Sequence, residues 1–218
     1  RADMLAENFR PGVMARLGFS YDDLRRINPG IIMVSSSGFG QTGPYAKRAA
    51  FDTVAQAMSG MMSVTGFDDR PGVRVGPAIA DSTGGFFGAL GTVLAIYARS
   101  RHGTVQRVDS NLLNGAVLLS SAWFSSYKGR PVRPLADKDQ YGLNPFHRLF
   151  RLADGWIYVA ADTEAQRRAL CGVAGQAEQS DAGSDGGGLH PNQTPLAEAL
   201  AAAFAKSGLA ELRAKLRE

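Results

Sequence analysis

The sequence predicts an α/β protein in which a domain with a largely parallel sheet precedes a smaller α+β domain. In the first half of the chain, short apolar runs alternate with helical patterns, which is typical of parallel strands joined by helices. A polar stretch with prolines follows at residues 127–144 and indicates an interdomain linker. Two apolar runs on either side of residues 153–155 then predict a hairpin in a second domain.

The elements of the first domain follow from local signals. Ser20 and the acidic residues after it start a helix that ends at residues 28–30 (NPG). The β-branched run at 31–36 predicts a buried strand, and the apolar run at 86–98 predicts a buried helix. The other expected elements are strands at 2–6, 73–80 and 103–109, and helices at 13–18, 51–60 and 112–121.

The second domain is expected to begin with the hairpin strands 146–152 and 156–161. After them we expect a helix at 166–173, a polar loop at 176–194 and a helical stretch at 195–216 that breaks near Gly208. The chain opens without Met and closes within a helical pattern. We therefore expect a piece of a longer protein, truncated at both ends.

Composition limits the class of protein. Of 218 residues, 44% are hydrophobic and 20% are charged, as in ordinary globular proteins. No apolar run reaches the roughly 18 residues of a membrane helix and no secretory signal opens the chain, so we expect a cytoplasmic protein without membrane contact. Cys171 is the only cysteine, which excludes an internal disulfide, and the three histidines lack metal-ligand spacing, so no metal site is predicted.

The formal charge of +4 comes mainly from arginines. No basic stripe with interleaved aromatic residues is present, so we do not expect nucleic acid as a partner. An anionic small molecule fits the arginines, and a solvated basic surface is the alternative. The arginines in question are Arg10, Arg16, Arg25, Arg26 and Arg48.

Asp81 stands out because it follows the predicted strand 73–80 and precedes a segment of small residues at 82–91. It has two interpretations. It is either the N-cap of the following helix, or a carboxylate placed at a helix N-terminus for chemistry. The glycine-rich loop at 37–44 (SGFGQTGP) lacks the endings of a P-loop and of the dinucleotide fingerprint, so by itself it is an ordinary strand-to-helix loop.

Four segments taken together carry a resemblance. They are residues 7–13 (ENFRPGV), 36–45 (SSGFGQTGPY), 51–60 (FDTVAQAMSG) and 76–85 (GPAIADSTGG). In order and spacing they resemble the class III coenzyme A transferases of the CaiB/BaiF type. That family includes formyl-CoA and carnitine-CoA transferases and 2-methylacyl-CoA racemase. The likeness extends to about residue 170.

The resemblance implies a Rossmann-like large CoA-binding domain, part of which we place at residues 1–126. It further implies a linker at 127–145 and part of a small domain at 146–218. Family members interlock as homodimers, so we expect the linker to pass around a partner chain. Coenzyme A or acyl-CoA would be a substrate and not a permanently bound cofactor, and a small carboxylic acid would be the other substrate.

The resemblance also implies roles for individual residues. Asp81 corresponds to the nucleophile, which would carry CoA from an acyl-CoA thioester to an acid through an aspartyl-CoA intermediate. The implied CoA contacts are Asn8, Phe9, Arg10, Val13, Arg16 and Arg48. The glycines expected to offer amides to an oxyanion are Gly38, Gly40, Gly84 and Gly85. Formyl-CoA transferase carries a lysine where this chain has Ser37, which puts that CoA contact in doubt.

Two other functions stay open at this point. The racemase branch uses a histidine directly before the aspartate that corresponds to Asp52, and this chain has Phe51 there. Because phenylalanine cannot exchange a proton, transferase is favoured over racemase. A family member or fragment that binds CoA without turnover is the third possibility, and the presence of Asp81 argues against it.

Overall fold

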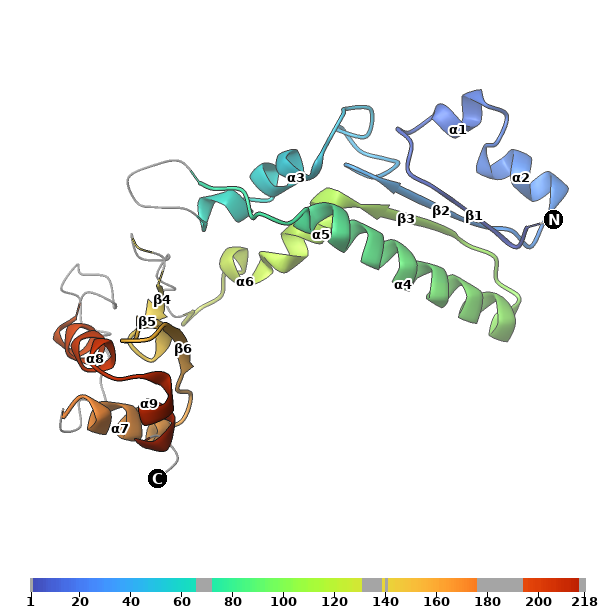
Figure 1. Cartoon of the computed structure of the whole chain (residues 1–218). Coiled ribbons are helices and arrows are strands. Elements are labelled where there is room, and N and C mark those ends of the chain that lie inside the picture. Colours follow the sequence, from blue (N-terminus) through green and yellow to red (C-terminus); the bar gives the residue numbers. More distant parts are fainter. Residues whose placement is uncertain (1, 66–71, 131–138, 140, 176–193, 216–218) are drawn as a thin grey trace. The chain divides into compact units, whose positions relative to one another are not determined.

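The computed structural model describes residues 2–65, 72–130, 139, 141–175 and 194–215 (Figure 1). These residues form two compact units, which are considered separately below: residues 2–65 with 72–130, and the described residues from 139 onward. About half of the predicted linker (131–138 and 140) and nearly all of the predicted loop at 176–194 lie outside the described residues.

The first unit contains a parallel sheet of three strands, as predicted for the large domain. They are β1 (Met4–Glu7), β2 (Ile32–Ser37) and β3 (Arg107–Asn111), in the spatial order β1-β2-β3. Both pairs are parallel, and Ser37 at the end of β2 lies opposite Asn111 at the end of β3. The strand predicted at 103–109 therefore begins and ends later than expected.

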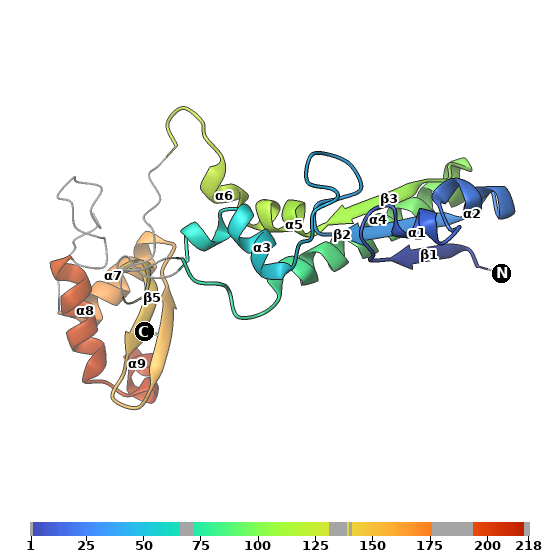
Figure 2. The ribbon, with the colours of Figure 1, turned by 90° about the horizontal axis from the view of Figure 1, so that it is seen from above.

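Helices cover both faces of this sheet (Figures 1 and 2). On one face lie α1 (Val13–Arg16) and α2 (Tyr21–Ile27), and Met33 of β2 packs there against Leu24. The long helix α4 (Ile79–His102) lies along the other face, where Ile32 and Val34 pack against its Ala95. The predicted start of α2 is confirmed, since Ser20 and Asp23 form a capping box.

The start of α4 corrects the sequence prediction. The helix begins at Ile79 and not at 86, and the described residues directly before it, 72–78, form no strand. Glycines misled the prediction because they weaken a helical pattern. In the structure three of them face the sheet or α5, and a Cβ added at Gly91 would lie 2.6 Å from Val108 Cγ1. Small residues on this helix thus permit close packing, not a turn.

The expectation that no apolar segment reaches the length of a membrane helix is also wrong. The 24-residue helix α4 is long and apolar enough to cross a membrane, judged by length and composition alone. The core helix of a soluble domain passes the same test. One face of α4 packs along β2 and β3, but only 22% of its most apolar stretch is buried within the described residues.

Two predicted helices, α3 (Asp52–Met58) and α5 (Leu112–Leu119), are confirmed and pack at the N-terminal end of α4. A short 3-10 helix, η1 (Met61–Ser63), follows α3, and α6 (Ser121–Phe124) follows α5. Buried side chains from these elements form one cluster: Ala55, Met61, Ala80, Leu112 and Ala116. This cluster fixes the first turn of α4 against its neighbours.

The second unit is an antiparallel sheet with three helices, as predicted for an α+β domain. Its strands are β4 (Gly142–Asn144), β5 (His147–Arg151) and β6 (Trp156–Ala160). Its helices are α7 (Glu164–Val173), α8 (Pro195–Ala205) and α9 (Leu209–Lys215). The hairpin and the helix break near Gly208 are confirmed, whereas β4 lies where the linker was expected.

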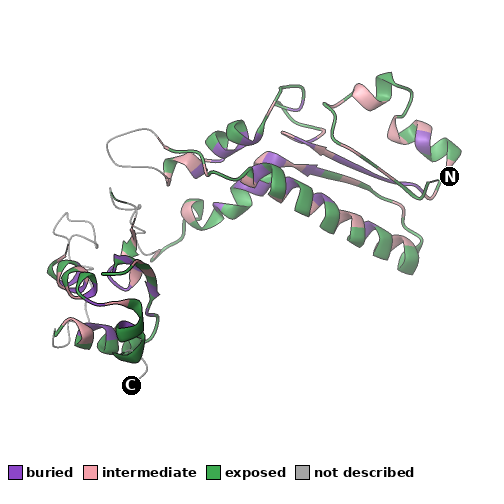
Figure 3. Ribbon diagram, viewed as in Figure 1, coloured by how far each residue is buried: buried purple, intermediate pink, exposed green. Residues whose placement is uncertain are grey.

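Buried residues of the second unit form one contiguous apolar core (Figure 3). Phe150 of β5 lies against Phe204 of α8, with ring centroids 4.6 Å apart. The carboxylate of Asp154 in the hairpin turn accepts the N–H of Leu209 at 3.0 Å, so the turn caps the start of α9.

Candidate active site

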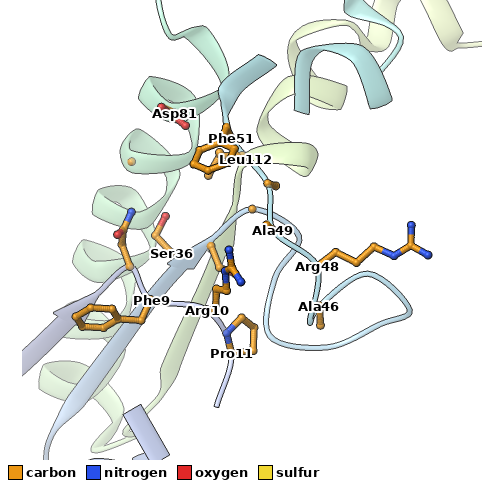
Figure 4. Close-up of a pocket in the computed structure, with 15 residues that line it drawn as sticks. Phe9, Arg10, Pro11, Ser36, Ala46, Arg48, Ala49, Phe51, Asp81 and Leu112 are labelled. Carbon is orange, nitrogen blue, oxygen red and sulfur yellow. The ribbon is translucent and has the colours of Figure 1, made fainter. Parts of the chain in front are cut away.

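A pocket of about 590 Å³ opens at the carboxyl end of the parallel sheet (Figure 4). Five segments of the first unit build its wall: the turn after β1, the end of β2, the stretch before α3, the first turns of α4 and the start of α5. The lining residues are Asn8, Phe9, Arg10, Pro11, Ser36, Ser37, Gly38, Ala46, Arg48, Ala49, Ala50, Phe51, Asp81, Gly85 and Leu112. In open α/β sheets ligands bind at this carboxyl edge.

Asp81 is the one carboxylate among the described residues that line this wall. It is the third residue of α4 and lies in the first turn, where the partial positive charge of the helix favours an anion. The N-cap interpretation is wrong, because the N-cap residue is Ala78. Partial desolvation raises the pKa of Asp81 above its ordinary value, and the negative charge of Asp52 raises it further.

Asp52, the first residue of α3, supplies the cap that α4 lacks. Its side chain is 8% exposed, and Oδ1 accepts the backbone N–H groups of Ala80 at 2.8 Å and of Asp81 at 3.3 Å. Ala78 has no side-chain acceptor for these donors. A carboxylate from one helix therefore holds the backbone of the Asp81 turn in another helix.

Gln56 completes this buried network one turn further along α3. Its Nε2 donates to Asp52 Oδ2 at 2.6 Å, and its Oε1 accepts the N–H of Val75 at 2.9 Å. Gln56 is fully buried. Sequence reasoning missed both Asp52 and Gln56 as site residues, since a cap from another helix leaves no local spacing signal. The only hint is the absence of a capping residue directly before Ile79.

The predicted CoA contacts divide into two groups. Asn8, Phe9, Arg10 and Arg48 all line the pocket, so the structure brings them to the same wall as Asp81. The Glu7 carboxylate accepts the Phe9 N–H at 2.7 Å and shapes the turn. The guanidinium of Arg48 lies over the ring of Tyr45, 4.7 Å from its centroid. Val13 and Arg16 lie on α1 and do not line this pocket.

The four predicted glycines differ in whether they line the pocket and in whether their N–H groups lie in a helix. Gly38 lines the pocket, and a Cβ there would overlap the Cβ of Ala50, so only glycine fits. Gly40 has φ +85° and lies beside Asp109 and Asn111, outside the lining. Gly84 and Gly85 lie within α4, where their N–H groups serve the helix. They were expected before a helix that starts at 86, whereas α4 already begins at Ile79.

Phe51 lines the pocket as the residue before α3, and its side chain is exposed. It takes the place of the racemase histidine, so the described wall contains no imidazole near Asp81. Among the residues that the structure describes, no three His, Cys, Asp or Glu side chains form a metal site.

Comparison with known proteins agrees with the resemblance carried by the four sequence segments. The model of CoA-transferase family III matches residues 1–218. The acetyl-CoA:oxalate CoA-transferase of Acetobacter aceti is 43% identical over 181 residues, which are 82% of this chain and 46% of the relative. The succinyl-CoA–D-citramalate CoA-transferase of Chloroflexus aurantiacus is 36% identical over 178 residues, or 81% of this chain and 44% of the relative.

Among solved structures, a CAIB/BAIF family protein from Brucella suis matches with a TM-score of 0.76 and 28% sequence identity. The match covers 99% of this chain and 58% of that one. The chain thus spans about half the length of the curated relatives that it matches. With its parallel sheet, its pocket and the match along its whole length, the chain belongs to CoA-transferase family III.

Proposed function

We propose that the protein transfers coenzyme A from an acyl-CoA thioester to a carboxylic acid, with Asp81 as the nucleophile. The observation that carries the proposal is the pocket itself, in which one carboxylate at a helix N-terminus shares a wall with Arg10 and Arg48. Arginine binds phosphate oxygens with two parallel hydrogen bonds, so these side chains suit the nucleotide part of CoA.

The chemistry needs no general base, since a carboxylate is ionised at neutral pH. Asp81 attacks the thioester carbonyl, the C–S bond breaks, and an acyl-aspartyl anhydride and the CoA thiolate form. The thiolate attacks the Asp81 carbonyl of this anhydride and releases the donor acid as its carboxylate, which leaves an aspartyl-CoA thioester. An acceptor carboxylate then repeats these steps in reverse order, forms the new acyl-CoA and frees Asp81.

Geometry at the start of α4 supports this role. Asp52 holds the backbone of the Asp81 turn, so the backbone that carries the nucleophilic side chain is fixed in position. Each attack creates an oxyanion, for which one amide donor contributes about 3 kcal/mol. Of the four glycines predicted as donors, Gly38 is the one that lines the pocket and lies outside a helix.

The substrate class is proposed from the relatives. Their names specify acetyl-CoA with oxalate and succinyl-CoA with D-citramalate. We therefore expect a short acyl-CoA as donor and a small carboxylic acid as acceptor.

The test is Asp81→Ala in the intact protein. Loss of the nucleophile should lower turnover by about 10⁴-fold or more, while affinity for CoA stays near that of the wild type. Mass spectrometry of the wild type with a panel of acyl-CoAs should detect CoA bound covalently to Asp81. Asp22→Ala, on the exposed side of α2, is the matched control. Wild-type turnover in Asp81→Ala would refute the proposal.

We propose a homodimer as well, with the interlocked arrangement of the family. Large apolar side chains are exposed along α4 in the described unit: Phe86, Leu90, Val93, Leu94 and Tyr97. A surface of this kind is typical of an interface. An interlocked dimer separates only when a chain opens, so sedimentation velocity should show no smaller folded species on dilution. A folded monomer at nanomolar concentration would exclude the interlock.

A further inference from the structure

Two serines of β2 have buried hydroxyl groups without a hydrogen-bond partner among the described residues. They are Ser35, which is 0% exposed, and Ser37, which is 7% exposed. A buried polar atom without a partner costs about 1–3 kcal/mol, so native structures rarely keep one without a reason. The two serines differ in one respect: Ser37 lines the pocket that contains Asp81, and Ser35 does not.

We infer that the Ser37 hydroxyl is a binding group for the CoA part of the substrate and donates a hydrogen bond to one of its oxygens. This inference rests on the proposed function. It assigns a role to a position at which formyl-CoA transferase has a lysine, and for which the resemblance therefore left the CoA contact in doubt.

The direction of the side chain indicates which part of the substrate it meets. Side chains alternate along a strand, and Val34 of β2 packs toward α4 whereas Met33 packs toward α2. By this alternation Ser37 belongs to the face of Met33, away from the helix that carries Asp81. The turn that contains Asn8 and Arg10 also lines the pocket, and it leads into α1, whose Met14 packs on the face of Met33.

The ligand oxygen at this place therefore belongs to CoA and not to the transferred acyl group. CoA offers two kinds of acceptor, the amide carbonyls of the pantetheine arm and the phosphate oxygens. Both accept from a hydroxyl, and a bond to a phosphate is the stronger of the two because the acceptor is charged.

The experiment compares Ser37→Ala with Ser35→Ala in the intact protein. Each variant removes a buried hydroxyl without a partner, so thermal unfolding should be unchanged or shifted slightly upward in both. In calorimetric titration Ser37→Ala should bind CoA about 3- to 30-fold more weakly, while Ser35→Ala binds CoA as the wild type does. Ser37→Cys keeps the shape of the side chain with a slightly larger atom and a weak donor, and it should follow Ser37→Ala.

Titration with pantetheine separates the two acceptors. A similar loss for pantetheine and CoA assigns the bond to an amide carbonyl, and a loss for CoA alone assigns it to a phosphate. Unchanged affinity for both ligands in Ser37→Ala would overturn the inference and leave water as the partner of the hydroxyl. A change confined to the KM of the carboxylic acid would overturn it too. Failure of the wild type to bind CoA would instead refute the proposed function.

Discussion

The two units of the chain differ in how each is packed internally. Among the described residues of the second unit, eleven buried ones form one core, in which aromatic rings from β5 and α8 are in contact. The described part of the first unit has three smaller clusters, and large apolar side chains of α4 remain exposed. Its carboxylate network holds the Asp81 turn at the pocket, and its closest helix–sheet contact, between Gly91 and Val108, lies outside the pocket lining.

Because of this difference, substitutions in the second unit should act mainly on stability, and substitutions at the site of the first unit should act mainly on activity. A continuous apolar core responds to loss of volume, since each removed group leaves a cavity. A site made of hydrogen bonds and close backbone packing responds to single atoms, because a donor without its acceptor or an added methyl group changes it. Substitutions in the two units should therefore have different consequences for stability and activity.

The largest expected change in stability is that of Phe204→Ala in the second unit. Phe204 is fully buried and contacts Phe150, so its truncation should cost about 3–5 kcal/mol. Native-state hydrogen exchange should show loss of protection in β5 and β6, while β2 and β3 keep theirs. Equal loss of protection in both sheets would show that the two units unfold together and would contradict the separation.

Asp52→Ala should affect the site in the first unit. It leaves the amides of Ala80 and Asp81 without their acceptor and removes the shorter of the two hydrogen bonds that Gln56 Nε2 donates, which should cost about 1–3 kcal/mol. Because the Asp81 turn loses its anchor, kcat should fall about 10- to 100-fold. Titration should find CoA affinity close to that of the wild type. A large loss of CoA affinity with unchanged kcat would contradict the positioning role.

Alanine substitutions at two glycines of α4 should change the stability of the protein in opposite directions. Gly91→Ala places a methyl group 2.6 Å from Val108 Cγ1 and should cost about 1–3 kcal/mol. A Cβ at Gly85 meets nothing within 4 Å, so Gly85→Ala should stabilise the helix by about 0.5–1 kcal/mol. Chemical denaturation measures the free energy of unfolding of both variants. Equal effects would mean that close packing on the sheet does not explain these glycines.

Much of the fold was predictable because its signals are local. The capping box at Ser20, the β-branched run of β2 and the hairpin about Asp154 each lie within a few residues. The start of α4 was not predictable in this way. Its glycines weaken the helical pattern, and the reason for them is contact with β3, which lies in a distant part of the sequence.

The site shows the same limit. The pocket brings together Asn8, Arg10, Arg48 and Asp81, which the family resemblance selected. Spacing alone left Asp81 with two interpretations, an N-cap and a carboxylate placed for chemistry. The true cap comes from Asp52 on another helix, a contact between residues that pattern analysis treats separately. Hydroxyl groups without partners, such as that of Ser37, are visible only once the surrounding atoms are placed.

The smallest predicted effect concerns the pH dependence of the Asp81 carboxylate. Its pKa is raised first by partial desolvation and second by the charge of Asp52, so the acidic limb of kcat/KM should lie above the ordinary pKa of aspartate. Asp52→Asn removes the second cause and keeps an oxygen for the Ala80 amide. More Asp81 is then ionised at a given acidic pH, so the limb should move to lower pH and still lie above the ordinary value. Asp22→Asn, on α2, is the control that should leave the limb in place. A limb that stays or rises in Asp52→Asn would show that the charge of Asp52 does not act on the nucleophile.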